Sequence, residues 1–456
     1  MNAVLLIVVP LLAAFLSILS KKVAPYLLTV IIVFNVALLA SGLLNYESIE
    51  IGGFVAPYGI ELVYDSYAKF ALLVVNGLFL ITVLFNIKGF AKLSSILLVG
   101  LAGLNGLLLT GDLFNLFVFL EVTAISAYLI SSTNKEPIHT FSYVVAGTVG
   151  SSLYLLGLIL LYNMFGTLNM AHMASAIQNV NLVTIAFPFL LMFIGLGVEA
   201  KLLPFNAWVK GILGTSNTLS GPMIAGVYTG ATLFVFGRLF TVVFQLSDSL
   251  MLIVLVVLGA SILAGEAMAY ASSKVREVLL YSSVAQAGIA LLLFALGFVE
   301  FGLLFVALNA VSKVVLFLVF NTLIQETNTD EIDGLSGVFQ QQVLLGVGVT
   351  AVILSLLGLP LFVGFTVKLG LLTSLFAAGE RLFPAIILLS SIVEGVYFIK
   401  LLVTLWHGDA VKQVAVKWPL VAFVTVVAIV LVVLGTYWTP VNDFVSGYLS
   451  TLGGLY

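Results

Sequence analysis

Cysteine is absent from the sequence of 456 residues, and histidine occurs only three times. Without thiolates the chain cannot form disulfides or bind cysteine-ligated iron–sulfur clusters. The histidines, His139, His172 and His407, are too scattered to indicate a metal-binding cluster. We therefore expect no metal, no cofactor and no catalytic residues in this chain, and any associated redox chemistry must take place on another polypeptide.

Charged residues are also scarce, at 8% of the chain against about 25% in soluble globular proteins. Hydrophobic residues make up 62%, and almost no long polar stretch leaves room for a separate soluble domain. This composition indicates an all-α polytopic membrane protein with a single membrane domain over residues 1–456, located in the cell membrane. We expect the lipid bilayer, and no nucleic acid, among its partners.

Apolar runs recur along the chain, and each is long enough to cross a bilayer core of about 30 Å. They predict about fourteen transmembrane helices, at roughly 3–19, 26–45, 69–87, 93–111, 113–132, 140–163, 182–203, 219–241, 249–271, 278–298, 301–323, 342–364, 384–406 and 418–438. The first run has no basic segment before it, so we interpret it as a span rather than a signal peptide. Between the second and third runs, residues 45–65 alternate polar and apolar side chains around several glycines, which predicts a β-hairpin on the outer face.

Lysine and arginine are distributed unevenly between the two ends of these runs. Eleven of the seventeen lie in or beside the loops after odd-numbered spans, and three, Lys69, Arg238 and Arg381, lie on the opposite side. The odd loops are therefore expected in the cytoplasm, with both termini on the outer face. The other three basic residues fall within apolar runs or beside a break: Lys201, Lys313 and Lys368.

The stretch GLGVEAKLLPFNAW, residues 195–208, combines charge with a helix break. Glu199 and Lys201 occur where the bilayer core is expected, and Pro204 then removes a backbone donor and interrupts the helix. Irregular backbone and charged groups occur at membrane depth only where they face protein or trapped water, as in transporters and proton relays. We predict the central site at this stretch.

Further ionisable residues follow inside the apolar runs. Glu121 is flanked by long apolar segments and needs a cationic partner, for which Lys201 is the natural candidate. Lys313, Lys368 and Glu394 continue the series in the second half of the chain. Each residue alone could be structural, as could Glu266, which lies nearer a span end and is either interfacial or part of the site. Together, with alternating sign, they indicate a polar axis that carries ions.

A second proline supports an internal repeat. Pro360 interrupts the twelfth span, five spans after the break at Pro204, and paired broken spans are typical of repeated transporter halves. An odd number of spans in each half makes the copies inverted. The predicted division is N-terminal helices and outer hairpin over 1–92, a first repeat over 93–244, a second repeat over 249–406, and a C-terminal helix and tail over 407–456.

Five segments carry a resemblance to a known family: GGFVAPYGIELVYD, GDLFNLFVFLEVTAISAYLI, SSLYLLGLILLYNMFGTLNMA, VREVLLYSSVAQAG and LSLLGLPLFVGFTVK. In this order they resemble the antiporter-like membrane subunits of the complex I superfamily. The second and third are most similar to Mrp D-type antiporter subunits and to subunits of archaeal membrane-bound hydrogenases and sulfane sulfur reductases. The resemblance implies fourteen spans, two inverted five-helix repeats and discontinuous seventh and twelfth helices. It also implies a glutamate and lysine proton relay, without catalysis of its own, inside a multi-subunit respiratory or antiporter complex.

By this resemblance Glu121 is similar to the fifth-span glutamate of the family. Lys313 is similar to the lysine of its Asn-His-x-x-x-Lys segment, and Lys368 to the residue that ends its twelfth helix. The family's seventh-span lysine precedes the break proline by five residues. That position here is Glu199, and Lys201 is displaced by two.

The chain departs from the family pattern at three points. Gly230 stands where a bridging lysine is usual, Ala310 replaces the histidine of the Asn-His segment, and WVKGIL follows the break in place of Trp-Leu-Pro-Asp-Ala-His. Two hypotheses therefore remain open: a subunit that translocates protons, or protons and sodium, along a wet path, and a structural spacer with a dry gap at Gly230 and Ala310. A transporter of an organic solute is a third, which lacks a polar binding cluster beyond the charge axis.

Overall fold

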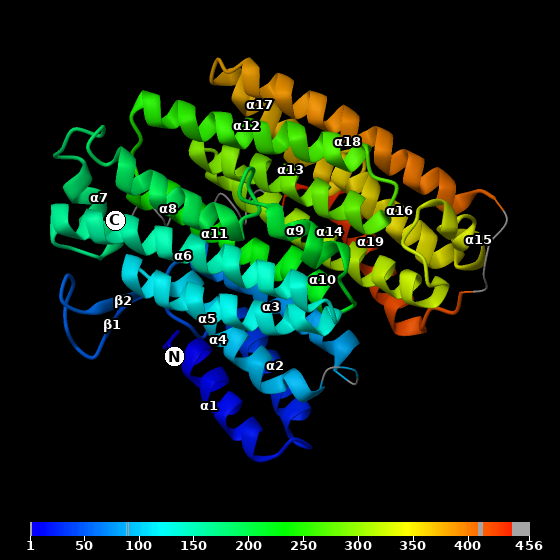
Figure 1. The fold of residues 1–456 in the computed structure, drawn as a ribbon, viewed down its shortest axis with the longest axis horizontal. Coiled ribbons are helices and arrows are strands. Elements are labelled where there is room, and N and C mark those ends of the chain that lie inside the picture. The colour runs from blue at the N-terminus through cyan, green and yellow to red at the C-terminus, as the bar shows by residue number, and fades with distance from the viewer. Residues whose placement is uncertain (1, 88, 90, 409–413, 440–456) are drawn as a thin grey trace.

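The computed structural model describes residues 2–87, 89, 91–408 and 414–439, so the predicted C-terminal tail lies largely outside the described residues. Figure 1 shows a bundle of helices that run broadly along the long axis, with the β-hairpin and α7 at one end and α15 at the other. The strands are β1 (Glu47–Ile51) and β2 (Ile60–Tyr64). The helices are α1 (Leu5–Leu19), α2 (Ala24–Ala40), α3 (Ser66–Asn86), η1 (Ala91–Leu93), α4 (Ser94–Leu109), α5 (Leu113–Ser131), η2 (Ser132–Asn134), α6 (Pro137–Phe165), α7 (Met170–Ile177), α8 (Ala186–Glu199), α9 (Ala207–Gly214), α10 (Ser220–Pro222), η3 (Met223–Tyr228), α11 (Thr229–Arg238), η4 (Leu239–Val243), α12 (Asp248–Tyr270), α13 (Val275–Ala295), α14 (Val299–Thr327), η5 (Asp333–Leu335), α15 (Val338–Gln341), α16 (Val343–Leu357), α17 (Val363–Ala377), α18 (Leu382–Trp406) and α19 (Trp418–Thr436).

The described part of the chain is a helical membrane protein. Ten helices are long and apolar enough to cross a bilayer, or eleven if the bent pair of η5–α15 and α16 counts as one span. Four further apolar helices, α1, α2, α8 and α17, are shorter. The predicted total of fourteen spans therefore stays a prediction.

The predicted hairpin at residues 45–65 is confirmed. β1 and β2 pair antiparallel, with Glu47 opposite Tyr64 and Ile51 opposite Ile60. The backbone amide of Gly111, between α4 and α5, donates to the carbonyl of Glu61 at 2.9 Å. The hairpin is thus fixed to the link between two helices of the bundle.

The charge pattern of the sequence assigns Arg238 to the outer side of the bundle, near the end of the eighth span. Its side chain is buried, and Nη2 lies 2.6 Å from Oδ1 of Asp65, which also caps the start of α3 by accepting from Ala68 N. The helical backbone continues beyond Arg238 through η4, so the guanidinium stays inside the bundle and needs a counter-ion there.

The prediction of a twelfth span over 342–364 omits the helix that follows it. In the structure α16 stops at Leu357, and a second apolar helix, α17, begins at Val363 and continues to Ala377. Lys368 interrupts the apolar run, which is why a count of apolar residues missed this helix.

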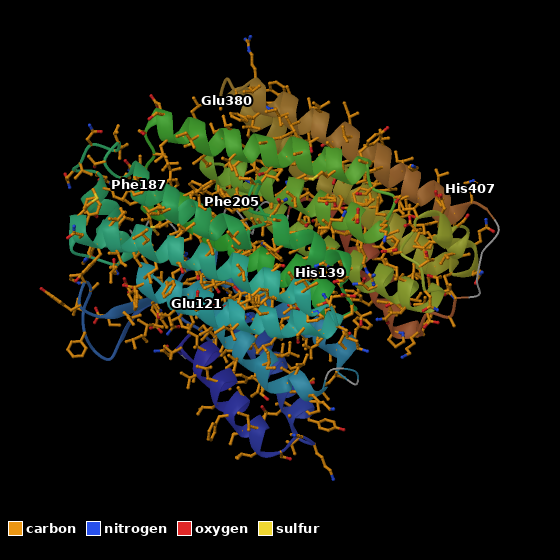
Figure 2. All side chains as sticks on the ribbon, viewed as in Figure 1. Glu121, His139, Phe187, Phe205, Glu380 and His407 are labelled. Carbon is orange, nitrogen blue, oxygen red and sulfur yellow. The ribbon has the colours of Figure 1, made fainter. Side chains whose placement is uncertain are left out.

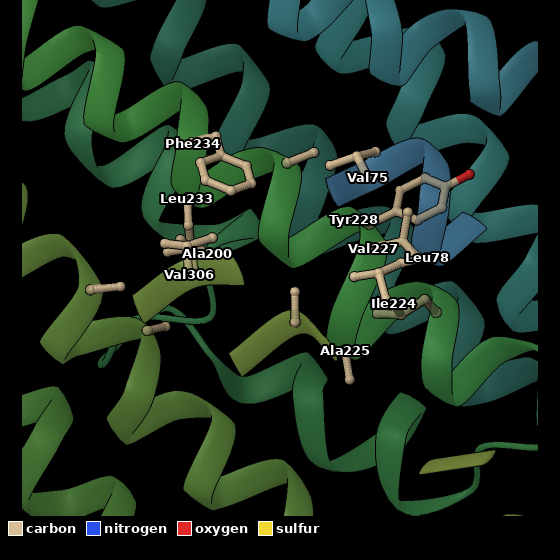
Figure 3. Packing of buried hydrophobic residues seen from close by; sticks show 14 of the residues in the cluster. Val75, Leu78, Ala200, Ile224, Ala225, Val227, Tyr228, Leu233, Phe234 and Val306 are labelled. Atoms are coloured by element: carbon tan, nitrogen blue, oxygen red, sulfur yellow. The ribbon is translucent and has the colours of Figure 1, made fainter. Parts of the chain in front are cut away.

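The centre of the bundle is formed by α11, α13 and α14. Of the most apolar stretch of α13, 94% is buried, whereas of that of α12 only 39% is buried. Helix α13 therefore lies inside the bundle and α12 lies at its surface. Figure 3 shows part of this interior, where Ala200 after the end of α8, Leu233 of α11 and Val306 of α14 lie buried. The core that surrounds the candidate site is therefore closely packed and apolar.

Close contact between α6 and α8 depends on small residues, as is common between membrane helices. A Cβ added at Gly195 would lie 2.5 Å from the carbonyl oxygen of Gly150 and 2.9 Å from the amide nitrogen of Tyr154. These distances are too short for a real Cβ, so glycine sets the separation of the two helices.

We predict that Gly195→Ala lowers the stability of the protein by about 1–3 kcal/mol, because the methyl group overpacks the α6–α8 contact. The matched control is Gly77→Ala on α3, where an added Cβ meets nothing within 4 Å. Both changes raise helix propensity equally, so the control should be neutral or slightly stabilising. Thermal unfolding in detergent measures the difference, and equal melting temperatures would contradict the prediction.

Candidate functional site

The end of α8 is closed by a left-handed residue that is not glycine. Lys201 has φ 65°, its amide donates to the carbonyl of Val198 at 3.2 Å, and the amide of Leu202 donates to that of Gly197 at 2.9 Å. This pair of bonds is a Schellman motif, whose left-handed position is usually glycine. Pro204 lies in the non-helical segment that follows, before α9 begins at Ala207.

The Lys201 side chain crosses to α13. It is fully buried, and Nζ donates to Oγ of Ser283 at 3.0 Å. Among the residues that the structure describes, no ion pair joins it to Glu121, so the expected Glu121–Lys201 partnership is wrong. The left-handed turn at the helix end directs Lys201 toward α13, while Glu199, two residues earlier, stays on the face toward α5 and α6.

Glu199 lies among aromatic residues of α5 and α6. Tyr143 Oη donates to its Oε2 at 3.2 Å, and the Tyr143 ring stacks on Trp208 of α9 at 3.9 Å between centroids. Glu121, labelled along α5 in Figure 2, is half-buried and close enough to Glu199 for the two carboxyl groups to interact electrostatically. The first half of the chain thus brings two acidic groups together.

Lys313 lies on α14 and is also buried. Its Nζ donates to Oγ of Ser282 and, at 3.4 Å, to the carbonyl oxygen of Leu279. Ser282 and Ser283 are adjacent on α13, so each of two neighbouring hydroxyl groups accepts a hydrogen bond from one lysine. The two lysines are close enough to interact electrostatically.

A cavity separates the elements that carry these lysines. Its volume open to the centre of a water molecule is about 20 Å³, and its walls come from α8's end, η3, α11, α13 and α14. The small residues Gly230 and Ala310, where the family pattern has larger groups, both line it. A space, rather than packed side chains, therefore occupies this part of the axis.

The second break holds an ion pair. α16 ends with Gly358 in the left-handed conformation, and Pro360 lies between α16 and α17. Lys368 of α17 lies 2.9 Å from Oε2 of Glu394 on α18, and its Nζ also donates to Oγ of Ser391 at 3.3 Å. Both side chains are buried.

Glu266 of α12 belongs to the same cluster. It is only 2% exposed and accepts a hydrogen bond from Ser390 Oγ at 2.9 Å, so its carboxyl group lies inside the bundle. It is close enough to Glu394 and Lys368 to interact with both. The sequence signal was a carboxylate within an apolar helix, and proximity to the span end obscured it.

Gln286 is a site residue that the sequence pattern did not reveal. Its Nε2 donates to Oε1 of Glu394 at 2.6 Å, and the same side chain lines the cavity that contains Lys201 and Lys313. A buried amide in the middle of an apolar helix was the available signal. Gln286 places a polar group between the lysine pair and the acidic cluster of the second half.

Together these groups form three neighbouring clusters. They are Glu121 with Glu199, Lys201 with Lys313, and Lys368 with Glu394 and Glu266. Lys313 is close enough to Glu394 and Glu266 for electrostatic interaction, so the second and third clusters influence each other. Carboxyl and amino groups of this kind can take up and release protons.

Comparison with known proteins places this geometry in context. Residues 110–393 match the family described as NADH:quinone oxidoreductase/Mrp antiporter, TM. The chain is 29% identical to the N-type subunit of NADH-quinone oxidoreductase from Desulforudis audaxviator over 436 residues, covering 88% of this chain and 85% of that protein. It is 26% identical to the D-type subunit of the Na(+)/H(+) antiporter from Bacillus subtilis over 434 residues, covering 89% and 87%. A chain of the membrane-bound sulfane sulfur reductase, an archaeal respiratory membrane complex, superposes with a TM-score of 0.90 at 28% identity, covering 97% and 96%.

We predict that Lys368→Met lowers the free energy of unfolding by about 3–5 kcal/mol, because it leaves the buried Glu394 without its counter-ion. The double variant Lys368→Met/Glu394→Met should be much closer to the wild type, since it removes both charges. Unfolding by a denaturing detergent in mixed micelles measures both.

The control for this comparison is the exposed pair Lys210–Glu277, at 3.1 Å with 59% of the lysine side chain exposed. Lys210→Met should change stability by less than about 1 kcal/mol. A double variant as unstable as Lys368→Met alone would show that the ion pair is not what the substitution disturbs.

Proposed function

The chain belongs to the NADH:quinone oxidoreductase/Mrp antiporter family of membrane subunits, and on that premise we propose that it translocates protons, alone or in exchange for sodium. It would do so as one subunit of a multi-subunit membrane complex, with the driving chemistry on other subunits. Its relatives include subunits named for NADH-quinone oxidoreductase and for Na(+)/H(+) antiport.

The observation that carries the proposal is the series of buried and half-buried ionisable groups from α5 to α18. We assign the relay to Glu121, Glu199, Lys201, Lys313, Glu394 and Lys368, with Glu266 as a further member. Burial of so many ionisable groups in an apolar bundle is costly and is typical of ion pathways. Glu121 and Glu199 would receive the proton at the α5 end of this series, and Lys368 with Glu394 would release it at the α18 end.

The proposed architecture follows from the two breaks. The ten long helices, together with α1, α2 and the broken spans α8–α9 and α16–α17, would make fourteen spans. The segments 93–244 and 249–406 would then be inverted repeats, each with one broken helix, within a single membrane domain. The ends of the half-helices leave backbone groups free to face a wet pathway, which is how broken helices serve transporters.

The proposed location is the plasma membrane, with the hairpin and both termini on the outer face. This orientation is supported by the excess of lysine and arginine on the opposite side. Other membrane subunits would cover the apolar surface that α5, α6, α12 and α18 expose.

A structural spacer is the second candidate function. It is favoured by Gly230 and Ala310, which place no ionisable side chain at the centre of the axis. In a spacer the buried charged residues would have no role in transport, and their removal would leave ion transport by the complex unchanged.

We predict that Lys313→Ala lowers ion translocation at least tenfold, because it removes the only ammonium group bonded to Ser282 in the part of the chain that the structure describes. The measurement is acidification, followed with a pH-sensitive dye, of vesicles that contain the complete complex. Lys400→Ala, at an exposed position of α18, is the matched control and should translocate normally. Normal translocation by both variants, with equal amounts of assembled complex, would establish the spacer.

A further inference from the structure

Helices α6 and α9 lie against each other from the first helix break to one end of the bundle. Beside the break, the ring of Tyr143 on α6 stacks on Trp208 of α9. One turn further along α6, His139 packs on Gly211 of α9, where an added Cβ would lie 2.7 Å from the imidazole Nδ1. Trp208 Nε1 also donates to the carbonyl of Val198 at 3.1 Å, so α9 is fixed to the last turn of α8.

His139 lies where this contact reaches the surface. Its side chain is half-buried, and Lys135 and Glu136, just before it in the chain, are exposed. Figure 2 labels His139 at the end of α6 that lies away from the β-hairpin. In the proposed orientation this end faces the cytoplasm, so the imidazole is in contact with the water from which protons would be drawn.

The same face of α6 leads from His139 to the first acidic cluster. His139, Tyr143 and Gly147 are spaced by four residues, which places them on one side of the helix. Tyr143 Oη donates to Oε2 of Glu199 at 3.2 Å, and a Cβ added at Gly147 would lie 3.0 Å from Oε1 of the same carboxylate. Both oxygens of Glu199 therefore lie close to this face.

The position of His139 coincides with a departure from the family pattern. Gly211 stands where the Trp-Leu-Pro-Asp-Ala-His motif has its aspartate, and the missing side chain leaves space that the imidazole of α6 occupies. The neighbouring Lys210 is engaged with Glu277 of α13, at 3.1 Å. Imidazole groups are suited to proton transfer near neutral pH, because one ring nitrogen can accept a proton while the other donates one.

We propose that His139 is the residue through which protons enter the relay from the inner face. This inference rests on the proposed function and names the entry to its first acidic cluster. His139 and Tyr143 are separated by about 6 Å of helix rise, which water at the half-buried imidazole spans. The hydroxyl of Tyr143 accepts one proton from that water as it donates its own to Glu199, so each transfer moves one proton and leaves Tyr143 neutral.

The first test compares the same substitution at two histidines. His139→Gln should lower translocation by about tenfold or more, because glutamine fills a similar space but cannot take up a proton. His172→Gln, at an exposed position of α7 near the hairpin, is the matched control and should translocate normally. Vesicle acidification is measured in complexes whose assembly is first shown to be equal. Wild-type rates in His139→Gln would overturn the proposal.

The second test distinguishes proton transfer from packing. In His139→Ala/Gly211→Asp, a carboxyl group on α9 enters the space that the imidazole leaves, and we expect most of the translocation lost in His139→Ala to return. His139→Ala/Gly211→Asn supplies the same shape without a group that titrates, and it should stay as slow as His139→Ala. Equal recovery in the two double variants would show that His139 only fills space, which would overturn the proposal.

Lys313→Ala separates this inference from the proposed function. Loss of translocation in Lys313→Ala together with wild-type rates in His139→Gln would overturn the entry residue alone. Wild-type rates in both variants would overturn the proposed function as well.

Discussion

The turn that ends α8 is the constraint on which the rest of the site depends. Glycine normally occupies the left-handed position of such a turn, and it would place no side chain there. In this chain Lys201 occupies it, so the same turn stops the helix and directs an ammonium group to α13. A left-handed lysine costs about 1–2 kcal/mol, and surrounding contacts must hold it in place. One of these is the amide of Leu203, which donates to Ser261 Oγ on α12 at 3.0 Å.

Most of the buried ionisable groups are satisfied by neutral partners rather than by counter-ions. Hydroxyl groups of Ser283, Ser282, Tyr143 and Ser390 contact Lys201, Lys313, Glu199 and Glu266, respectively. A neutral partner fixes the position of an ionisable group without requiring one charge state, because a hydroxyl can donate or accept. Protonation at these positions can therefore change while the packing of the helices stays the same. The proposed relay requires this property, and a set of structural salt bridges would not.

Local features of this fold could be predicted from the sequence. The hydrogen-bond and ion-pair partners that lie far apart in the chain could not. The hairpin follows from alternating residues beside glycines, and the interruptions near Pro204 and Pro360 follow from the lost backbone donor of proline. The ion pair between Arg238 and Asp65 was not predicted, because the two residues are 173 positions apart in the chain. The Glu121–Lys201 pair was wrong because the direction of a side chain after a left-handed turn depends on backbone torsions that composition and spacing do not encode. Gln286 was overlooked for a related reason, since its importance lies in its contact with Glu394 on another helix.

The two helix breaks differ in the residue that ends the first half-helix and in the partner of the nearby lysine. At the first, the left-handed residue that ends the helix is Lys201, which contacts a serine. At the second, the residue that ends α16 is Gly358, and the space that a Cβ would need there is occupied by the side chain of Lys368. Lys368 is thereby held against Glu394 in an ion pair. Lys313 lies between the two breaks and attracts the same carboxylate when it is charged. In the proposed relay, a proton that reaches Lys313 would therefore weaken the ion pair between Glu394 and Lys368.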